Sequence, residues 1–283
     1  MKISYFPDQI SLAGRPIMEK FIATVSKTDS VKLNDMNCDA VVIWSVLWQG
    51  RMIKNQQVYN HYRDAGKPVI ILETGNLIRG KTFKVCINNI NGLGQHAIPD
   101  ELDLTRISKF TGVTSPIVRG NSIMICTQQD KSLLWKGQIP ALHWVEKTLD
   151  TVRRFSRKPV IVRVHPKHRG MDLHYLTRKY KNVMVQTPEV TNDVADFTKS
   201  LKSVWCVVNH NSGCAVEAAM HSIPVFCDGS SLAGKLSNLN LKDIESAVCK
   251  TTQSWMDFVV HTEWFVDEIE QGIPWKILRN KLS

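Results

Sequence analysis

One stretch in the second half of the chain, Trp205–Phe226, constrains the fold more than any other part of the sequence. Its apolar run up to Val208 predicts a buried strand, the polar residues Asn209–Gly213 predict a turn, and a helix and a second strand follow. Backbone N–H groups at the start of a helix lack internal partners and carry partial positive charge. The turn therefore suits a diphosphate, and Glu217, one helical turn further on, would face the same ligand.

Strands alternate with helical stretches along the whole chain, which is typical of parallel sheets with crossover helices. The predicted strands are 2–6, 40–46, 68–73, 83–88, 122–127, 159–164, 182–186, 204–209 and 224–227. The predicted helices are 15–26, 53–65, 140–155, 172–180, 192–200, 214–221, 254–261 and 263–271.

A chain of 283 residues exceeds what one hydrophobic core usually spans, so we expect two domains. The boundary is placed near Arg119, giving domains at 1–119 and 120–262. Residues 263–283 are expected to form a C-terminal helical segment that packs back on the first domain, with Trp264 and Trp275 in the core.

Composition narrows the functional classes. No apolar run approaches the roughly 20 residues that a membrane helix needs, so stable membrane insertion is not expected. The N-terminal segment is soon broken by Pro7 and Asp8, unlike a signal peptide, which favours a cytoplasmic location. Seven cysteines without a Cys-x-x-Cys pair argue against a zinc site, and we expect no bound metal.

The chain carries 36 Lys and Arg against 26 Asp and Glu, a formal charge of +10 that favours a polyanionic partner or an anionic substrate. Basic residues concentrate in Arg153–Lys158, Arg163–Arg169 and Arg178–Lys181. A solvated helix face is the alternative explanation for such runs. Because these runs flank the predicted strand 159–164, we also consider a role for them in ligand binding.

His165 and Pro166 directly follow the apolar strand at 159–164. Ligands of open parallel sheets bind beyond the carboxyl ends of the strands, so His165 is placed to contact one. A histidine at a strand end is by itself more often a structural hydrogen-bonding residue. Its pairing with the turn Asn209–Gly213, at the end of another such strand, favours the binding role.

With these residues the sequence resembles glycosyltransferases of the GT-B type, and specifically the capsule Kdo transferases and the bacterial polysialyltransferases. His165-Pro166 and Ser212-Gly213-x-x-x-Glu217 match the His-Pro motif and the Ser-rich turn of that group. Its acidic-acidic-Gly motif has Glu73-Thr74-Gly75 as the candidate here, with a threonine where a second acid is usual. The segment 122–130 is similar to the first strand and loop of the donor domain, and the resemblance covers most of 68–228.

The resemblance implies an α/β protein with two Rossmann-like domains facing across a cleft. The first domain would bind the acceptor and the second a nucleotide-sugar donor, either a UDP-sugar or a CMP-sugar. It implies that His165 and the backbone of Asn211–Gly213 hold the phosphates and that Glu217 holds the ribose hydroxyls. No metal would be required, because helix dipoles and basic groups can offset the charge of the leaving phosphate. The predicted donor-binding residues are Arg163, Lys167, His210, Asn211, Ser212, Gly213 and Glu217, with His165 as a catalytic residue.

Sugar transfer to a hydroxyl also calls for a carboxylate that accepts a proton or stabilises the reacting centre. Glu73, at the end of the apolar strand 68–73, is the first candidate, although it could equally be a turn-stabilising acid. The reserve candidates are Asp8, after the first strand, and Asp100, which lies with Glu101 and Asp103 on the connection between the halves.

The basic charge and the absence of an obvious amphipathic anchor favour double-stranded DNA as the partner. The preferred acceptor is a 5-hydroxymethylpyrimidine in phage DNA, modified in the cytoplasm of an infected cell after the base leaves the stack. Two alternatives stay open. One is a glycosyltransferase of surface polysaccharide or lipid, and the other is a non-catalytic nucleotide-binding or nucleic-acid-binding protein.

Overall fold

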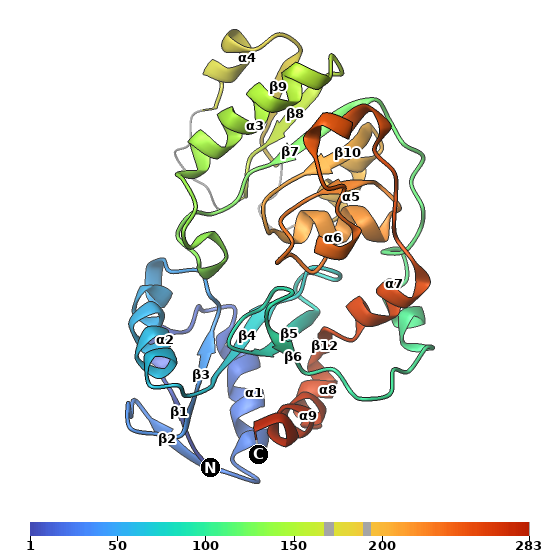
Figure 1. Ribbon diagram of the computed structural model, residues 1–283. Helices are drawn as coiled ribbons and strands as arrows, with labels where there is room; N and C mark the ends of the chain where they lie inside the picture. The colour runs from blue at the N-terminus through green and yellow to red at the C-terminus, as the bar shows by residue number, and fades with distance from the viewer. Residues whose placement is uncertain (167–172, 189–193, 283) are drawn as a thin grey trace. The chain divides into compact units, whose positions relative to one another are not determined.

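The computed structural model describes residues 1–166, 173–188 and 194–282. The chain forms two compact units. Unit 1 comprises Met1–Lys109, Lys131–Leu133 and Asp257–Ser283, and unit 2 comprises Phe110–Asp130 and Leu134–Met256. Each unit contains a β-sheet flanked by helices (Figure 1), so the predicted α/β class is confirmed. The acceptor-binding and donor-binding roles given to 1–119 and 120–262 stay predictions.

The sheet of unit 1 has the strand order β12-β5-β4-β3-β1-β2, and β6 also pairs with β5. The strands are β1 (Lys2–Tyr5), β2 (Ser30–Leu33), β3 (Ala40–Trp44), β4 (Val69–Thr74), β5 (Thr82–Ile87), β6 (Gln95–His96) and β12 (Glu263–Phe265). Strands β1 to β4 are parallel, whereas β5 runs antiparallel to β4, β6 and β12. The helices are α1 (Arg15–Val25), α2 (Asn55–Asp64), α8 (Val266–Glu270) and α9 (Ile273–Leu282), with 3-10 turns η1 (Pro7–Gln9), η2 (Gly50–Lys54) and η3 (Arg106–Phe110).

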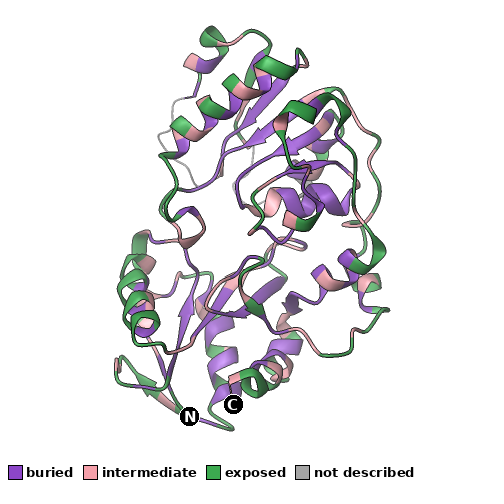
Figure 2. Ribbon diagram, viewed as in Figure 1, coloured by how far each residue is buried: buried purple, intermediate pink, exposed green. Residues whose placement is uncertain are grey.

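Alternation of side chains along the strands gives this sheet two buried faces. On one face, Ile70, Leu72 and Val85 pack with Phe21 of α1 and Trp275 of α9 in a single core. Helix α2 packs against β3 and β4. Figure 2 shows the strands as mostly buried, with the exposed residues on the outer sides of the helices.

The sheet of unit 2 is wholly parallel, with the order β11-β10-β7-β8-β9. Its strands are β7 (Ser122–Cys126), β8 (Val160–Arg163), β9 (Val183–Gln186), β10 (Val204–Val208) and β11 (Val225–Phe226). Its helices are α3 (Ala141–Phe155), α4 (Tyr175–Lys179), α5 (Val194–Leu201) and α6 (Gly213–Met220), with the 3-10 turns η5 (Gly234–Leu236) and η6 (Leu241–Ser246). Helix α7 (Gln253–Val260) and the 3-10 turn η4 (Leu133–Trp135) each have residues in both units. The direction of strand addition reverses between β7 and β10, which makes their carboxyl ends the topological switch point.

Helices cover both faces of the second sheet. Val145 and Leu149 of α3 and Ile244 of η6 pack on the face that carries Val160 and Val162. The next residue of β8, Arg163, points to the opposite face and contacts α5. Strands buried on both sides read as nearly continuous apolar runs, which is why their positions were predictable.

The structure corrects the prediction for the C-terminal segment. The helix expected over 263–271 is wrong for its first three residues, because Glu263–Phe265 form β12 and pair antiparallel with β5. Pairing to a distant strand here outweighs the helical spacing of the apolar residues. Helix α9 lies inside the segment 263–283 that was expected to be helical. The burial predicted for Trp264 and Trp275 is confirmed, at 3% and 2% exposed.

Within the described ranges, no helix combines the length and the apolar character needed to cross a bilayer.

Candidate functional site

The loops after β7, β8 and β10 meet at the carboxyl edge of the unit 2 sheet. Thr127 follows β7, and its Oγ1 accepts a hydrogen bond of 2.8 Å from the backbone N–H of His165, after β8. The neighbouring Gln128 accepts one of 2.8 Å through Oε1 from the backbone N–H of Asn211, after β10. Thr127 and Gln128 are 2% and 5% exposed. The structure therefore joins the His-Pro motif and the Asn209–Gly213 turn through the loop of the switch-point strand.

The turn itself is held by its asparagines. Asn209 Nδ2 donates to the carbonyl oxygen of Ser212 at 3.1 Å and to its Oγ at 2.6 Å. Asn211 Nδ2 donates to Ser230 Oγ at 2.6 Å. Ser212 is the extended residue before α6, and its side chain accepts from Asn209 and caps no helix N–H. Ser212, Gly213 and Cys214 are half-buried, so the first turn of α6 can be reached from solvent.

Two enclosed side-chain atoms flank the switch point without a hydrogen-bond partner among the described residues. They are Asn209 Oδ1, after β10, and Gln129 Nε2, after β7. Asn209 and Gln129 are 3% and 7% exposed. Buried polar atoms are nearly always paired, so an unpaired acceptor and an unpaired donor at one strand edge are typical of a site that a ligand or water completes.

His210 is 9% exposed, and its ring meets Trp135 edge-on, with 5.0 Å between centroids. Burial lowers the pKa of His210, and the carboxylate of Asp228 opposes this shift only in part. The imidazole is therefore neutral at neutral pH, and it can give or take a hydrogen bond but supplies no positive charge to a phosphate.

The structure gives Arg163 internal partners. It is 6% exposed and donates to Gln186 Oε1 at 2.8 Å, to Ser200 Oγ at 3.0 Å and to Asp196 Oδ2 at 2.5 Å. The charge of Arg163 is thus balanced on α5. In the strand order, its strand β8 is separated by β7 from β10, the strand that precedes the Asn209–Gly213 turn. Glu217 is 7% exposed on α6. Lys167 lies outside the described residues.

In unit 1, Glu73 lies half-buried at the carboxyl end of β4. Its Oε2 accepts a hydrogen bond of 2.6 Å from Ser45 Oγ, and its Oε1 accepts one of 2.9 Å from the backbone N–H of Thr74. Ser45 follows the neighbouring strand β3 and has a φ of +67°, which is uncommon for a residue other than glycine. The carboxylate is therefore fixed in orientation by the two adjacent strand ends.

Glu263 is a residue of this region that the sequence analysis missed. It is 0% exposed, and its carboxylate accepts hydrogen bonds from the backbone N–H of Asn76 at 2.6 Å, from that of Leu77 at 3.1 Å and from Thr82 Oγ1 at 2.7 Å. A Cβ at Gly75 would lie 2.3 Å from Glu263 Oε2, so only glycine fits there. The turn after Glu73 is consequently built around a buried charge. An acid directly before the apolar run 264–266 was the available signal.

The reserve acids lie in less enclosed places. Asp8 is exposed on η1, and Asp100 is exposed on the irregular segment between β6 and η3. Within the described part of the chain, no hydrogen bond joins either one to Glu73. Asp103 Oδ1 accepts from the backbone N–H of Thr105 at 2.9 Å and from its hydroxyl at 2.6 Å, as a turn-stabilising acid does.

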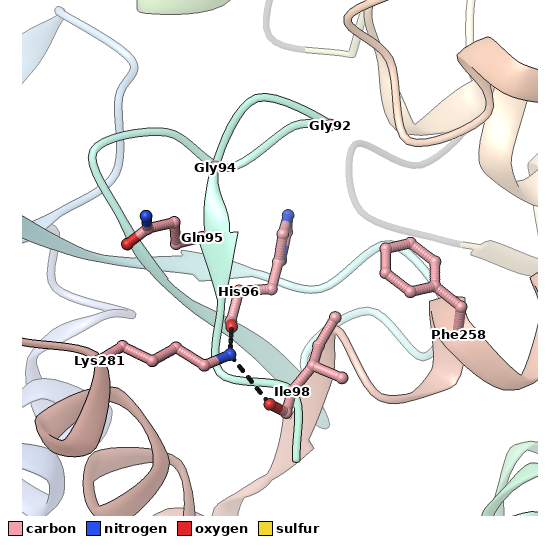
Figure 3. Close-up of a pocket in the computed structure, with 7 residues that line it drawn as sticks. All are labelled: Gly92, Gly94, Gln95, His96, Ile98, Phe258 and Lys281. Atoms are coloured by element: carbon pink, nitrogen blue, oxygen red, sulfur yellow. Dashed lines mark hydrogen bonds between the residues drawn. The ribbon is translucent and has the colours of Figure 1, made fainter. Parts of the chain in front are cut away.

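A hollow of about 470 Å³ also opens in unit 1 (Figure 3). It is lined by Gly92, Gly94, Gln95, His96, Ile98, Phe258 and Lys281. Lys281 Nζ donates to the carbonyl oxygens of His96 at 3.1 Å and Ile98 at 3.0 Å. His96 Nδ1 lies 3.1 Å from Cys86 Sγ, while burial lowers the pKa of His96 to about 4 and raises that of Cys86 to about 12. Both groups are neutral at neutral pH, so this contact is structural.

No cluster of three or more His, Cys, Asp and Glu side chains suited to a metal ion occurs among the residues that the structure describes.

The sequence matches no protein-family model, and no curated protein matches it. In structure, the chain is similar to the beta Kdo 2,4 transferase of KpsC from Thermosulfurimonas dismutans, with a TM-score of 0.55 and 15% sequence identity over 97% of this chain and 98% of that one. The beta Kdo 2,7 transferase of the same KpsC gives 0.48 and 13% over 99% and 100%. MurG from Acinetobacter baumannii gives 0.39 and 9% over 98% and 99%. The first likeness shows that the fold is of the GT-B kind.

Alkylation of Cys214 should block ligand binding at the turn. Cys214 is the half-buried second residue of α6, and its thiol interacts with that of the buried Cys126, so a maleimide on its sulfur would displace the first helical turn. In a Cys227→Ser, Cys249→Ser background, we expect N-ethylmaleimide to weaken CMP or UDP binding more than tenfold by calorimetry, and bound nucleotide to slow the alkylation. Alkylating Cys249, which is exposed, in a Cys214→Val, Cys227→Ser variant is the matched control. Unchanged binding after modification of Cys214 would remove the turn from the site.

His96 should make the protein less stable in acid. Its pKa is about 4 when folded against 6.5 ordinarily, so unfolding takes up a proton between these values. This contribution is present above pH 6.5 and is lost as the pH falls towards 4, by about 2 kcal/mol between pH 7 and pH 5. Urea unfolding of His96→Gln should show a correspondingly weaker pH dependence, whereas His61→Gln, at an exposed position of the same unit, should keep that of the wild type. Equal slopes for His96→Gln and wild type would contradict this.

Replacing Glu263 by Gln should loosen the turn after Glu73. The amide keeps one acceptor oxygen but turns an NH₂ group towards backbone donors, which leaves buried N–H groups unpaired. We expect a loss on the order of 3 kcal/mol in the free energy of unfolding. Glu270→Gln removes an exposed carboxylate paired with Lys20 and should change stability by about 0.5 kcal/mol or less. A similarly small effect at both positions would show that the buried carboxylate does not hold the turn.

Proposed function

We propose that this chain is a glycosyltransferase that moves a sugar from a nucleotide-sugar donor to a hydroxyl acceptor. The observation that carries the proposal is the arrangement at the switch point of unit 2, where the start of α6, the His165 backbone and the Thr127–Gln129 loop converge on one sheet edge. Nucleotides bind at this place in doubly wound sheets, with phosphate at a helix N-terminus. The GT-B likeness supports the same proposal.

The donor phosphates would lie over the first turn of α6, where Gly213 leaves room for close approach of an anion. The N–H groups and the helix dipole there would stabilise the charge that develops on the leaving phosphate, in the manner of a preorganised anion site, without need of a divalent cation. Asn209 Oδ1 and Gln129 Nε2, the enclosed unpaired acceptor and donor, would complete their hydrogen bonds with the nucleotide. Glu217 would bind the ribose hydroxyls.

Glu73 would serve the acceptor. A general base must reach the proton that it removes, and an orienting hydrogen bond from another group makes it effective. Ser45 Oγ and the Thr74 N–H provide that orientation for the Glu73 carboxylate. The half-buried setting leaves room for an acceptor hydroxyl at the same carboxylate.

The acceptor that we favour is a 5-hydroxymethylpyrimidine in phage DNA, modified in the cytoplasm of an infected cell. The formal charge of +10 supports it, because a protein that holds duplex DNA must neutralise phosphates. A surface saccharide or lipid is the second candidate, and the likeness to a beta Kdo transferase supports that one.

Both candidates are tested by incubating the protein with UDP-sugars and CMP-sugars and two acceptors, DNA containing 5-hydroxymethylcytosine or 5-hydroxymethyluracil and a Kdo-terminated oligosaccharide. Mass spectrometry should show one added sugar residue on one acceptor. We expect Glu73→Gln to lower the rate on the order of 10²- to 10⁴-fold while nucleotide binding persists, because it removes only proton transfer. His165→Ala should lower the rate as well.

Asp64→Asn, at an exposed position on α2 of the same unit, is the control and should keep the activity. Full activity in Glu73→Gln would sink the assignment of Glu73. Binding of a nucleotide sugar without transfer to either acceptor would instead point to a non-catalytic nucleotide-binding protein.

A further inference from the structure

Lys84 occupies an unusual position in the sheet of unit 1. In the strand register it lies directly opposite Glu73 of β4 on one side and opposite Glu263 of β12 on the other. Directly opposed residues share a face of a sheet, with Cβ atoms about 5 Å apart. Glu73, Lys84 and Glu263 therefore form a row across the strands β4, β5 and β12. The strand neighbours of Lys84, Phe83 and Val85, face the apolar core, so the row lies on the other side of the sheet.

The two carboxylates of this row already have partners other than the lysine. Glu73 accepts hydrogen bonds from Ser45 Oγ and the Thr74 N–H, and Glu263 accepts three, all from the turn and from Thr82. Lys84 Nζ makes no hydrogen bond and no ion pair with any residue that the structure describes, although the residue is only 4% exposed. The ammonium is not among the unpaired atoms that are completely enclosed, so it has access to solvent.

An ammonium group carries three N–H donors and is strongly hydrated in water. Keeping it nearly buried without a hydrogen-bond partner is unfavourable, and buried charges are normally paired. One explanation is that Lys84 only balances the two carboxylates through space. That role, however, leaves all three donors without a protein acceptor beside the carboxylate proposed as the base. A group with oxygen acceptors that arrives from solvent would use them.

We propose that Lys84 binds an oxyanion of the acceptor, a carboxylate or a phosphate, next to the hydroxyl that reacts at Glu73. This inference rests on the proposed function for the identity of the ligand as an acceptor. Its consequence is a restriction on substrate class: the acceptor carries a negative charge within a few ångströms of its reacting hydroxyl. The phosphodiester of a nucleotide and the carboxylate of an acidic sugar both satisfy this requirement, and a neutral sugar does not.

The test compares charged and neutral probes in the absence of donor. The probes are a duplex DNA oligonucleotide, a Kdo oligosaccharide and the same oligosaccharide with its carboxylates reduced to alcohols. Wild type should bind at least one charged probe, and Lys84→Met should bind that probe at least tenfold more weakly, with no change for the reduced oligosaccharide. Lys81→Met, at an exposed position of the same hairpin, should behave as the wild type.

A second measurement follows the lysine in the wild-type protein. In wild-type protein labelled with ε-¹³C lysine, the Lys84 resonance, identified by its loss in Lys84→Arg, should shift when the charged probe is added. A shift with DNA identifies the phosphodiester as the source of the oxyanion, and a shift with the oligosaccharide identifies the carboxylate. No shift with either probe overturns the inference, as does equal binding by Lys84→Met.

The two proposals fail separately in these experiments. Sugar transfer with wild-type kinetics in Lys84→Met would reject the oxyanion site and leave the glycosyltransferase standing. Lys84-dependent binding of a charged probe without any transfer would keep the oxyanion site and reject the transferase.

Discussion

The carboxylate of Glu263 ties together parts of unit 1 that are far apart in the sequence. Glu263 lies on β12 near the end of the chain. Its carboxylate accepts hydrogen bonds from the backbone N–H groups of Asn76 and Leu77, more than 180 residues earlier. Arg106 also stabilises this strand. It donates hydrogen bonds to the Glu263 carbonyl oxygen at 2.6 Å and to the Glu268 carboxylate at 2.6 and 2.8 Å. The Glu73 turn and the C-terminal segment therefore stabilise each other, because a buried carboxylate without donors would be strongly unfavourable.

Unit 2 builds its candidate site from a different constraint. All of its strands are parallel, and the order of addition reverses at β7 and β10, so the loops that follow these strands are brought together by topology. Short polar side chains then fix the loops to one another, as between Gln128 and Asn211. The two candidate sites differ accordingly, since one depends on the order of neighbouring βα units and the other on the return of a distant strand.

This difference explains what could be predicted from the sequence. The turn Asn209–Gly213 and the position of His165 just after β8 were predictable, because apolar runs mark buried parallel strands and polar residues mark their ends. Strand β12 and the role of Glu263 were not, because Glu263–Phe265 have a helix-compatible spacing and only the pairing with β5 makes them a strand. The ion pair of Arg163 was not predictable either. A basic residue in a strand indicates a charge there, but its partner Asp196 comes from the crossover helix α5.

The two units would also bind negatively charged groups of the substrates by different physical means. At α6 the anion site would consist of backbone N–H groups and a helix dipole, beside a His210 whose pKa is lowered by burial, so the positive potential there does not rely on a titrating side chain. In unit 1 the proposed oxyanion contact would be the ammonium of Lys84, set between two carboxylates that are already hydrogen-bonded. Dipoles suit a phosphate that must leave with its charge, whereas a fixed ammonium suits an acceptor whose charge does not change during the reaction.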